Sequence, residues 1–212
     1  MIETEIVLYG DNDPLEGCDL LMVADEDARL YELGSDLLKN SGCAKAHPVM
    51  VKRKDFIFTL NHCQENRIVA CGLIWSADLE EELMRGGERG GIVEVGRISW
   101  YDEDSIYGRP ALALMGPLGS DWRELRGSPR ISVDNRYPLL SGEYLKNLKH
   151  GGYTFRQTGL GGLPCRECVG TRYDAAVGLI DSFEVVDRTG LWPLEKIVES
   201  EPVIVRLRGP SE

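Results

Sequence analysis

The sequence lacks any long hydrophobic run: no apolar stretch approaches the ~20 residues that a membrane-spanning helix needs. Positive charge is also scarce, with 24 lysines and arginines against 35 acidic residues and a formal net charge of −11. An excess of negative charge of this size repels phosphate backbones, which argues against general nucleic-acid binding. The first residues carry neither the basic nor the apolar segment of a secretion signal. These absences predict a cytoplasmic protein that binds neither nucleic acid nor membrane.

The cysteines do not form a disulfide framework. The six cysteines lack tight, even spacing, and only Cys165 and Cys168 form a CxxC pair. One such pair supplies only half of the ligands of a structural zinc, and the three histidines are scattered. The sequence also contains no P-loop, dinucleotide fingerprint, nucleophile elbow or HExxH motif. We therefore expect reduced, structural cysteines and no standard nucleotide or hydrolase motif.

Short apolar runs alternate with helix-like stretches along the chain. Leucines 30, 33, 37 and 38 stand at helical spacing and predict a helix over 26–40. The near-continuous apolar run 67–75 is typical of a strand buried on both faces, and Ser76 is a suitable N-cap for a helix over 76–85. Further strands are expected at 6–9, 19–24, 92–100, 111–116, 130–134, 153–158, 174–181 and 202–208, and further helices at 121–127, 138–150 and 192–200.

This alternation predicts an α/β fold with largely parallel sheets. Roughly ten strands in a chain of this length suit two small sheets better than one wide sheet. We therefore expect two lobes with a ligand cleft between them. Lobe I would cover 1–105, with 188–212 returning to it, and lobe II would cover 106–187. In such folds ligands bind at the carboxyl ends of strands, near helix N-termini.

The C-terminal part contains segments that follow a known order: RISVDNRYPLLSGEYLKN at 130–147, DAAVGLIDSFEVVDRTGL at 174–191 and LEKIVESEPVIV at 194–205. With weaker matches upstream at 28–42, 51–55, 70–79 and 108–117, the chain resembles the short-form catalytic subunit of ATP phosphoribosyltransferase, the first enzyme of histidine biosynthesis. The resemblance implies a two-lobed, periplasmic-binding-protein-like fold. It also implies a glycosyltransferase that condenses ATP with phosphoribosyl pyrophosphate.

The resemblance implies a site that combines acids on the ribose side with groups that bind the substrates. The residues expected from it are the catalytic pair Asp174 and Asp181 and the substrate-binding residues Arg29, Lys52 and Ser182. Trp75, Phe183 and Glu184 depart from the family pattern and are expected to bind substrate at the same cleft. Asp181 and Glu184 would also ligate Mg²⁺, which neutralises a pyrophosphate leaving group. A homodimer or higher oligomer and a histidyl-tRNA-synthetase-like regulatory subunit are the expected partners.

The expected phosphate loop departs from the family pattern E-[ST]-G-T-T. Phe183 replaces the glycine that lets the backbone approach a phosphate, and Glu184 replaces a threonine and adds negative charge. Upstream, the family's basic P-K-G-R element corresponds to residues 26–29, of which only Arg29 is basic. A phosphate dianion would therefore meet repulsion here unless Glu184 turns away or a metal intervenes.

These departures leave two further hypotheses open. The first is a relative of the same fold that binds a neutral or cationic small molecule, with Asp181, Glu184 and Asp187 as polar anchors and Phe183 and Trp75 as apolar walls. The second is a catalytically inert subunit of an active partner. The acids 181–187 are equally compatible with a solvated helix start that follows a strand.

Overall fold

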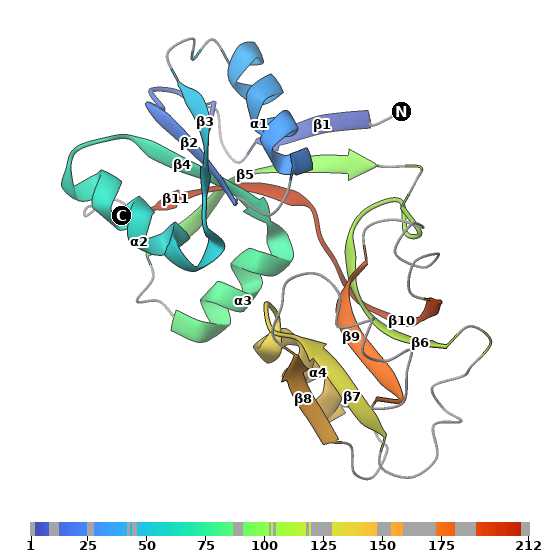
Figure 1. Cartoon of the computed structure of the whole chain (residues 1–212). Helices are drawn as coiled ribbons and strands as arrows, with labels where there is room; N and C mark the ends of the chain where they lie inside the picture. The colour runs from blue at the N-terminus through green and yellow to red at the C-terminus, as the bar shows by residue number, and fades with distance from the viewer. Residues whose placement is uncertain are drawn as a thin grey trace. The chain divides into compact units, whose positions relative to one another are not determined.

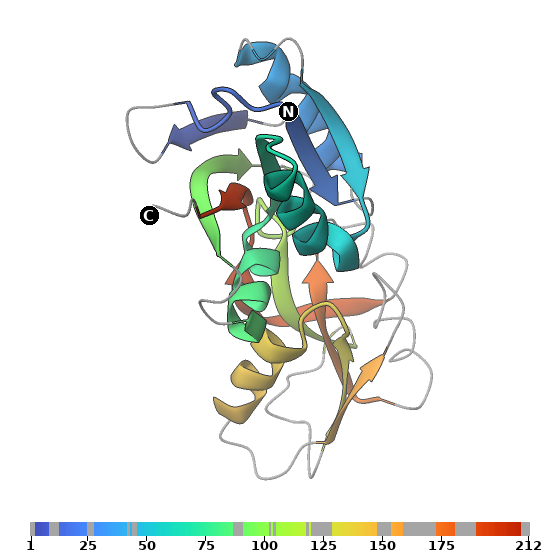
Figure 2. The ribbon, with the colours of Figure 1, turned by 90° about the vertical axis from the view of Figure 1, so that its left-hand side faces the viewer.

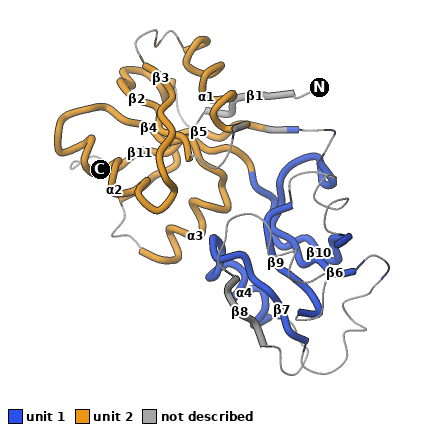
Figure 3. Tube along the Cα trace, in the orientation of Figure 1, with its two compact units in different colours: residues 1–2, 101–200 blue, residues 3–100, 201–212 orange. Residues whose placement is uncertain are grey.

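The computed structural model describes a large part of the 212-residue chain: residues 3–8, 13–24, 28–41, 43, 46–86, 91–101, 103, 105–117, 119, 129–147, 154–158, 173–180 and 190–208. The chain divides into two compact units, shown in Figure 3. Unit 1 consists of residues 1–2 and 101–200, and unit 2 consists of residues 3–100 and 201–212. The chain therefore leaves unit 2 after residue 100 and returns to it at Glu201.

Unit 2 combines strands and helices around one sheet (Figure 1). Its strands are β1 (Glu3–Leu8), β2 (Leu20–Ala24), β3 (His47–Val51), β4 (Ala70–Trp75), β5 (Ile92–Tyr101) and β11 (Pro202–Leu207). They form a six-stranded sheet in the order β1-β5-β11-β4-β2-β3. Strand β2 runs parallel to β3 and β4, whereas β11 runs antiparallel to β4 and β5. The helices are α1 (Ala28–Asn40), the short 3₁₀ helix η1 (Arg53–Asp55), α2 (Phe56–Glu65) and α3 (Ser76–Gly86).

Strand β4 lies at the centre of unit 2 and is buried on both faces. Cys71 and Trp75 belong to a core cluster that includes Leu30 of α1. Ile74 belongs to a second cluster, which includes Phe56 of α2. Successive side chains of a strand point to opposite faces, so helices α1 and α2 cover opposite sides of the sheet, as Figures 1 and 2 show. The predicted doubly buried strand is confirmed, and it begins at Ala70 rather than at residue 67.

Unit 1 is built on a second sheet. Its strands are β6 (Ala111–Pro117), β7 (Arg130–Asp134), β8 (Thr154–Thr158), β9 (Ala175–Ile180) and β10 (Leu191–Glu199), and its helix is α4 (Pro138–Asn147). The five strands follow the order β10-β6-β9-β7-β8. Strand β7 is parallel to β8 and β9, and β6 is antiparallel to β9 and β10. Both sheets are thus mixed, whereas the sequence favoured largely parallel ones.

Strand β10 differs from what the sequence predicted, both in secondary structure and in the point at which the chain returns to unit 2. Residues 192–200 were expected to form a helix, but Leu191–Glu199 pair with β6. The register shifts between Pro193 and Glu195 and between Lys196 and Val198, which breaks the period-two pattern of a regular strand. Because of this pairing, residues 190–200 stay in unit 1, and the return to unit 2 comes at Glu201 rather than at residue 188.

The described residues bear on two expectations from composition. No helix in the described ranges is long and apolar enough to cross a bilayer. The cysteines in those ranges (Cys18, Cys43, Cys63 and Cys71) are free, and all except Cys43 are buried, in agreement with reduced structural cysteines. Cys165 and Cys168 lie outside the described residues.

Gly72 is expected to be essential for the packing of α2 on β4. A Cβ atom at residue 72 would lie 2.5 Å from Phe56 Cζ and 3.0 Å from Val205 Cγ2. Gly72→Ala should therefore lower the free energy of unfolding by about 1–3 kcal/mol, measured by urea denaturation. Gly142→Ala is the matched control, since a Cβ there meets no atom within 4 Å in helix α4. It should raise stability by about 0.5–1 kcal/mol. A neutral Gly72→Ala variant would contradict this packing.

Candidate functional site

The parallel strands of unit 2 end together at one edge of the sheet. Ala24, the last residue of β2, pairs with Val51, the last residue of β3, and β4 runs alongside β2 in the same direction. Three residues expected from the sequence lie where these strands end: Arg29 in the first turn of α1, Lys52 directly after β3, and Trp75 at the end of β4. We call this region the carboxyl edge of unit 2.

Trp75 supports Arg29 but does not form an exposed wall. The Arg29 guanidinium carbon lies 5.7 Å from the centre of the Trp75 ring, a distance that permits a cation–π interaction. Trp75 is only 3% exposed and belongs to the core cluster beneath α1. The expected role of Trp75 as an apolar wall is therefore corrected, because the core already occupies the indole ring.

A largely buried ion pair, not identified from the sequence, crosses the carboxyl edge of unit 2. Arg53 in η1 donates to the carboxylate of Asp78 in the first turn of α3. The Asp78 side chain is 8% exposed. An acid in this turn also interacts favourably with the partial positive charge of a helix N-terminus. The pair fixes the segment after β3 to the helix after β4.

The start of α3 is also held to β11. The Ser76 amide donates to the Glu201 carbonyl oxygen at 2.8 Å, and the Ser76 hydroxyl accepts from the Glu201 amide at 3.1 Å. Arg97 on β5 lies 3.8 Å from the Glu201 carboxylate. The Ser76 hydroxyl therefore links the start of α3 to Glu201, the residue before β11. The sequence analysis expected this hydroxyl to cap the N-terminus of α3 instead.

Exposed cations lie at the carboxyl edge of unit 2. Lys52 and Lys54 flank Arg53, both are exposed, and neither forms an ion pair with a described residue. Arg29 adds a further positive charge at the start of α1. Asp55, which is also exposed, adds a negative charge to η1. The sequence also has Asp25, Glu26 and Asp27 directly after β2, and these acids lie outside the described residues.

Unit 1 has a comparable turn at the carboxyl end of β7. Strand β7 runs parallel to β9, with Val133 opposite Val177. Asp134, which is buried, accepts hydrogen bonds from Arg136 Nη2 at 2.7 Å and Nε at 3.0 Å. Arg136 also lies over the buried ring of Tyr137, at 5.4 Å. The sequence analysis did not single out this turn, although it lies within the 130–147 match.

Asp174 lies at the wrong end of β9 for the expected catalytic role. It precedes the strand, and its Oδ2 accepts from the Arg130 amide at 2.7 Å. The six residues of β9 separate Asp174 from the carboxyl end at Ile180, a length of about 20 Å at the usual strand rise. Since ligands of such folds bind at carboxyl ends, this position does not favour the expected pairing of Asp174 with Asp181, which stays a prediction.

The remaining expected site residues, Asp181, Ser182, Phe183 and Glu184, lie outside the described residues, as does Asp187. Among the described residues, no group of three or more histidine, cysteine, aspartate or glutamate side chains is placed to hold a metal ion. A metal site built from described residues alone is therefore not supported.

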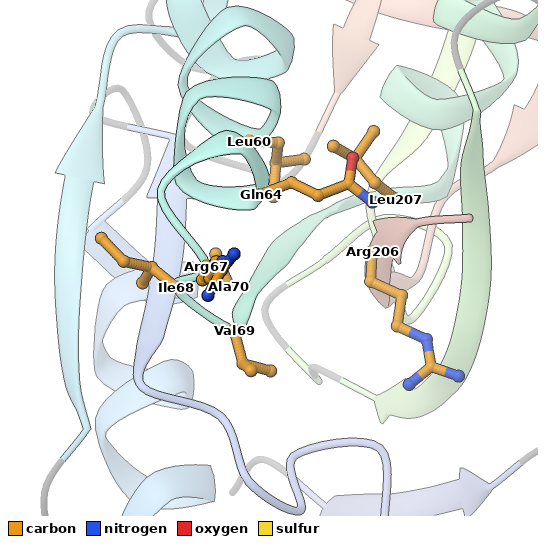
Figure 4. Close-up of a pocket in the computed structure, with 8 residues that line it drawn as sticks. All are labelled: Leu60, Gln64, Arg67, Ile68, Val69, Ala70, Arg206 and Leu207. Carbon is orange, nitrogen blue, oxygen red and sulfur yellow. The ribbon is translucent and has the colours of Figure 1, made fainter. Parts of the chain in front are cut away.

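A pocket of about 240 Å³ opens at the opposite, amino end of β4 (Figure 4). Its surface is mostly apolar, with arginines from the α2–β4 turn and from β11. The lining residues are Leu60, Gln64, Arg67, Ile68, Val69, Ala70, Arg206 and Leu207. None of the site residues expected from the sequence is among them. The pocket is therefore separate from the carboxyl edge of unit 2.

Comparisons with known proteins establish the fold. No family model matches the chain, and no curated protein matches its sequence. The ATP phosphoribosyl transferase (HisG:HisZ) complex from Thermotoga maritima has a similar structure, with a TM-score of 0.58, 18% identity and coverage of 89% of this chain and 87% of that chain. Tv2483 bound to L-arginine is also similar (TM-score 0.56, 11% identity, coverage 93% and 80%).

The periplasmic aliphatic sulphonate binding protein SsuA from Escherichia coli is a third similar structure (TM-score 0.58, 13% identity, coverage 91% of this chain and 62% of that chain). At these identities the likeness shows the fold alone. The two-lobed, periplasmic-binding-protein-like α/β fold is therefore confirmed.

The Arg53–Asp78 pair should contribute strongly to the stability of unit 2. Asp78→Ala leaves a partly buried guanidinium without its carboxylate, and it should lower the free energy of unfolding by about 2–4 kcal/mol in urea denaturation. Asp36→Ala is the control, because Asp36 pairs with Lys39 on the exposed face of α1. Its effect should stay below about 0.5 kcal/mol. Equal effects of the two substitutions would show that the Arg53–Asp78 pair does not hold η1 to α3.

Proposed function

We propose that the chain is a phosphoribosyltransferase-like enzyme that condenses ATP with phosphoribosyl pyrophosphate, as in histidine biosynthesis. The observation that carries the proposal is the set of cations at the carboxyl edge of unit 2, where Lys52 and Lys54 are exposed and Arg29 lies in the first turn of α1. Two further observations support the same activity. The segments 130–147 and 174–191 resemble those of the family, and the fold is similar to that of the Thermotoga maritima enzyme complex.

The cations of unit 2 suit a polyphosphate. Lys52 and Lys54 are exposed point charges on flexible side chains, which can follow the oxygens of a triphosphate. Arg29 is oriented by its contact with Trp75, so its position costs less side-chain entropy on binding. Arg53 is committed to Asp78 and positions the basic turn. We therefore propose the nucleotide site at this edge.

The proposed reaction places the N1 nitrogen of the adenine at C1 of the ribose while pyrophosphate leaves. Mg²⁺, when bound, neutralises and orients the leaving group. Asp181 and Glu184 are its proposed ligands, since Mg²⁺ commonly uses one or two carboxylates together with substrate phosphates. Ser182 is the proposed donor to the 5-phosphate, and Phe183 the residue that borders it. Asp174 has no part in this proposal, because it lies at the amino end of β9.

The proposed enzyme is cytoplasmic and works as a homodimer or higher oligomer. A histidyl-tRNA-synthetase-like regulatory subunit is its proposed partner. The Thermotoga maritima structure, named as a HisG:HisZ complex, supports a partner subunit for a protein of this fold.

A second candidate is a relative of the same fold that binds a neutral or cationic small molecule, or an inert subunit. The acids at 181, 184 and 187 favour it, because they follow β9 where a ligand of this fold would bind. A protein of similar fold is bound to L-arginine, which is a cation. In this candidate Phe183 remains the apolar wall, and the buried Trp75 does not contribute.

Ligand-dependent thermal unfolding separates the two candidates. Phosphoribosyl pyrophosphate with Mg²⁺, and ATP, should each raise Tm by several degrees, because a ligand at 100 times its Kd adds about 2.7 kcal/mol of stability. L-arginine and a neutral sugar serve as the opposing probes. A shift with L-arginine alone would favour the second candidate, and no shift with either anion at millimolar concentration would overturn the first.

Charge-matched variants place the anion site. Arg29→Gln and Lys52→Gln should each weaken the ATP-dependent shift, whereas Lys146→Gln should leave it unchanged, since Lys146 is an exposed lysine of α4 in unit 1. Pyrophosphate release with both substrates, measured by chromatography, should fall in the same two variants. Equal losses in all three variants would mean that only net charge matters and would remove the assignment to the carboxyl edge of unit 2.

A further inference from the structure

The pocket at the amino end of β4 is built by three segments of unit 2: the end of α2, the turn that leads into β4, and β11 (Figure 4). We call it the amino-end pocket (residues 60, 64, 67–70, 206 and 207). Leu60 is only 1% exposed and belongs to a core cluster against which Ala70 and Leu207 also pack. Core packing therefore fixes this part of the lining.

The apolar run that the sequence analysis assigned to one buried strand extends past that strand to the amino-end pocket. Strand β4 begins at Ala70, whereas Ile68 and Val69 precede it and are 41% and 51% exposed. Apolar surface gains free energy when it is removed from water. A ligand with an apolar body would cover these two adjacent side chains and gain that free energy.

Arg67 occupies a backbone position that favours glycine. Among the described residues other than glycine, Arg67 alone has a positive φ, of 59°. The turn is a Schellman motif, in which the Arg67 amide donates to the Gln64 carbonyl at 3.0 Å and the Ile68 amide donates to the Cys63 carbonyl at 2.9 Å. The residue after the C-cap of this motif is usually glycine, because a Cβ atom is unfavourable in the left-handed region. The turn therefore gives no reason for an arginine at this position.

The amino-end pocket offers such a reason. The Arg67 side chain forms no hydrogen bond or ion pair with a described residue, and Arg206 on β11 lines the same pocket. No acid is among the described lining residues. A guanidinium next to apolar side chains suits a carboxylate on an apolar body, because its N–H groups can donate to both carboxylate oxygens.

Nearby acids limit the negative charge that the amino-end pocket can accept. Asp19 Oδ2 accepts from the Val69 amide at 3.0 Å, and Glu65 is the last residue of α2. Glu88 and Glu212, in the segments that precede β5 and follow β11, lie outside the described residues. A monoanion therefore suits the pocket better than a phosphate dianion, which would also lose more hydration against a mostly apolar surface.

We propose that the amino-end pocket is a second binding site, which takes a small monocarboxylate with an apolar body. Arg67 binds the carboxylate, and Leu60, Ile68 and Val69 contact the body. At about 240 Å³ the pocket is smaller than the ~300–1,000 Å³ pockets that enclose drug-sized ligands, so an aromatic or branched aliphatic carboxylate is the expected size. This site is separate from the carboxyl edge of unit 2, and its ligand differs from both proposed substrates.

Methyl NMR of the full chain tests the site in the absence of ATP and phosphoribosyl pyrophosphate. The probe is 3-phenylpropionate, its neutral counterpart is 3-phenylpropanamide, and acetate is the anion without an apolar body. Phenylpropionate should cause saturable shifts of the Leu60, Ile68 and Val69 methyl signals, with affinity about tenfold or more above that of the other two compounds. The buried methyl groups of Leu114 and Ile131, on β6 and β7 of unit 1, should not shift.

Arg67→Gly separates the role of the side chain from that of the turn. It should weaken phenylpropionate binding by about tenfold or more, and it should keep or raise Tm, because glycine suits the left-handed position. A purely structural role of Arg67 predicts a lower Tm instead. Arg67→Lys should retain part of the binding, since it keeps the charge. Lys39→Gln is the control, because Lys39 is an exposed cation on α1, and it should leave binding unchanged.

Several results would overturn the proposal. These are equal shifts with phenylpropionate and its amide, unchanged binding in Arg67→Gly, and no saturable shift at millimolar concentration with either phenylpropionate or 4-methylpentanoate. Tighter binding of phenyl phosphate would overturn the assignment to a carboxylate. Lys52→Gln should leave the methyl shifts unchanged, because Lys52 lies at the opposite edge of the sheet. Failure of this site is therefore distinguishable from failure of the proposed nucleotide site.

Discussion

The reciprocal hydrogen bonds between Ser76 and Glu201 fix the point on which the rest of unit 2 depends. They tie the end of β4, where α3 begins, to the start of β11, where the chain re-enters this unit. With this junction fixed, Asp78 in the first turn of α3 reaches Arg53, and Trp75 lies beneath Arg29. Buried Ser76 therefore fixes the start of α3, which carries Asp78, to the segment that re-enters unit 2.

The sequence predicted most of this framework because its strands are short and strongly apolar. The run before Ser76 indicated a strand buried on both faces, and the structure packs its two faces into separate clusters. Helix α2 was missed, although Phe56, Leu60 and Cys63 have helical spacing and are buried. Strand β10 was misread because its two register shifts remove the alternation on which strand prediction relies.

The sequence predicted less of the candidate site than of the fold. Arg29 and Lys52 were expected from the family matches at 28–42 and 51–55, whereas strand β3, which ends just before Lys52, was not expected from the sequence. The Arg53–Asp78 pair could not be predicted from the sequence, because this contact depends on how β2 pairs with both β3 and β4. The position of Asp174 before β9 could not be foreseen for a related reason: a motif gives the order of residues along the chain, whereas the length of β9 decides which edge of the sheet each residue reaches.

The fold alone does not decide the charge of the ligand. Structures similar to this chain include a sulphonate-binding protein and a protein bound to L-arginine, ligand classes of opposite charge. The charge of the ligand must therefore follow from the charged residues around the site. These residues differ between the described and the undescribed parts of the chain. At the carboxyl edge of unit 2 Lys52 and Lys54 are exposed, whereas the sequence has acids at 25–27 after β2 and at 181, 184 and 187 after β9. The proposed phosphorylated substrate would need a divalent cation to neutralise acids near its pyrophosphate, whereas exposed lysines suit its phosphates directly. A cationic ligand would use the acids alone, and Lys52 and Lys54 would then have no part in binding it.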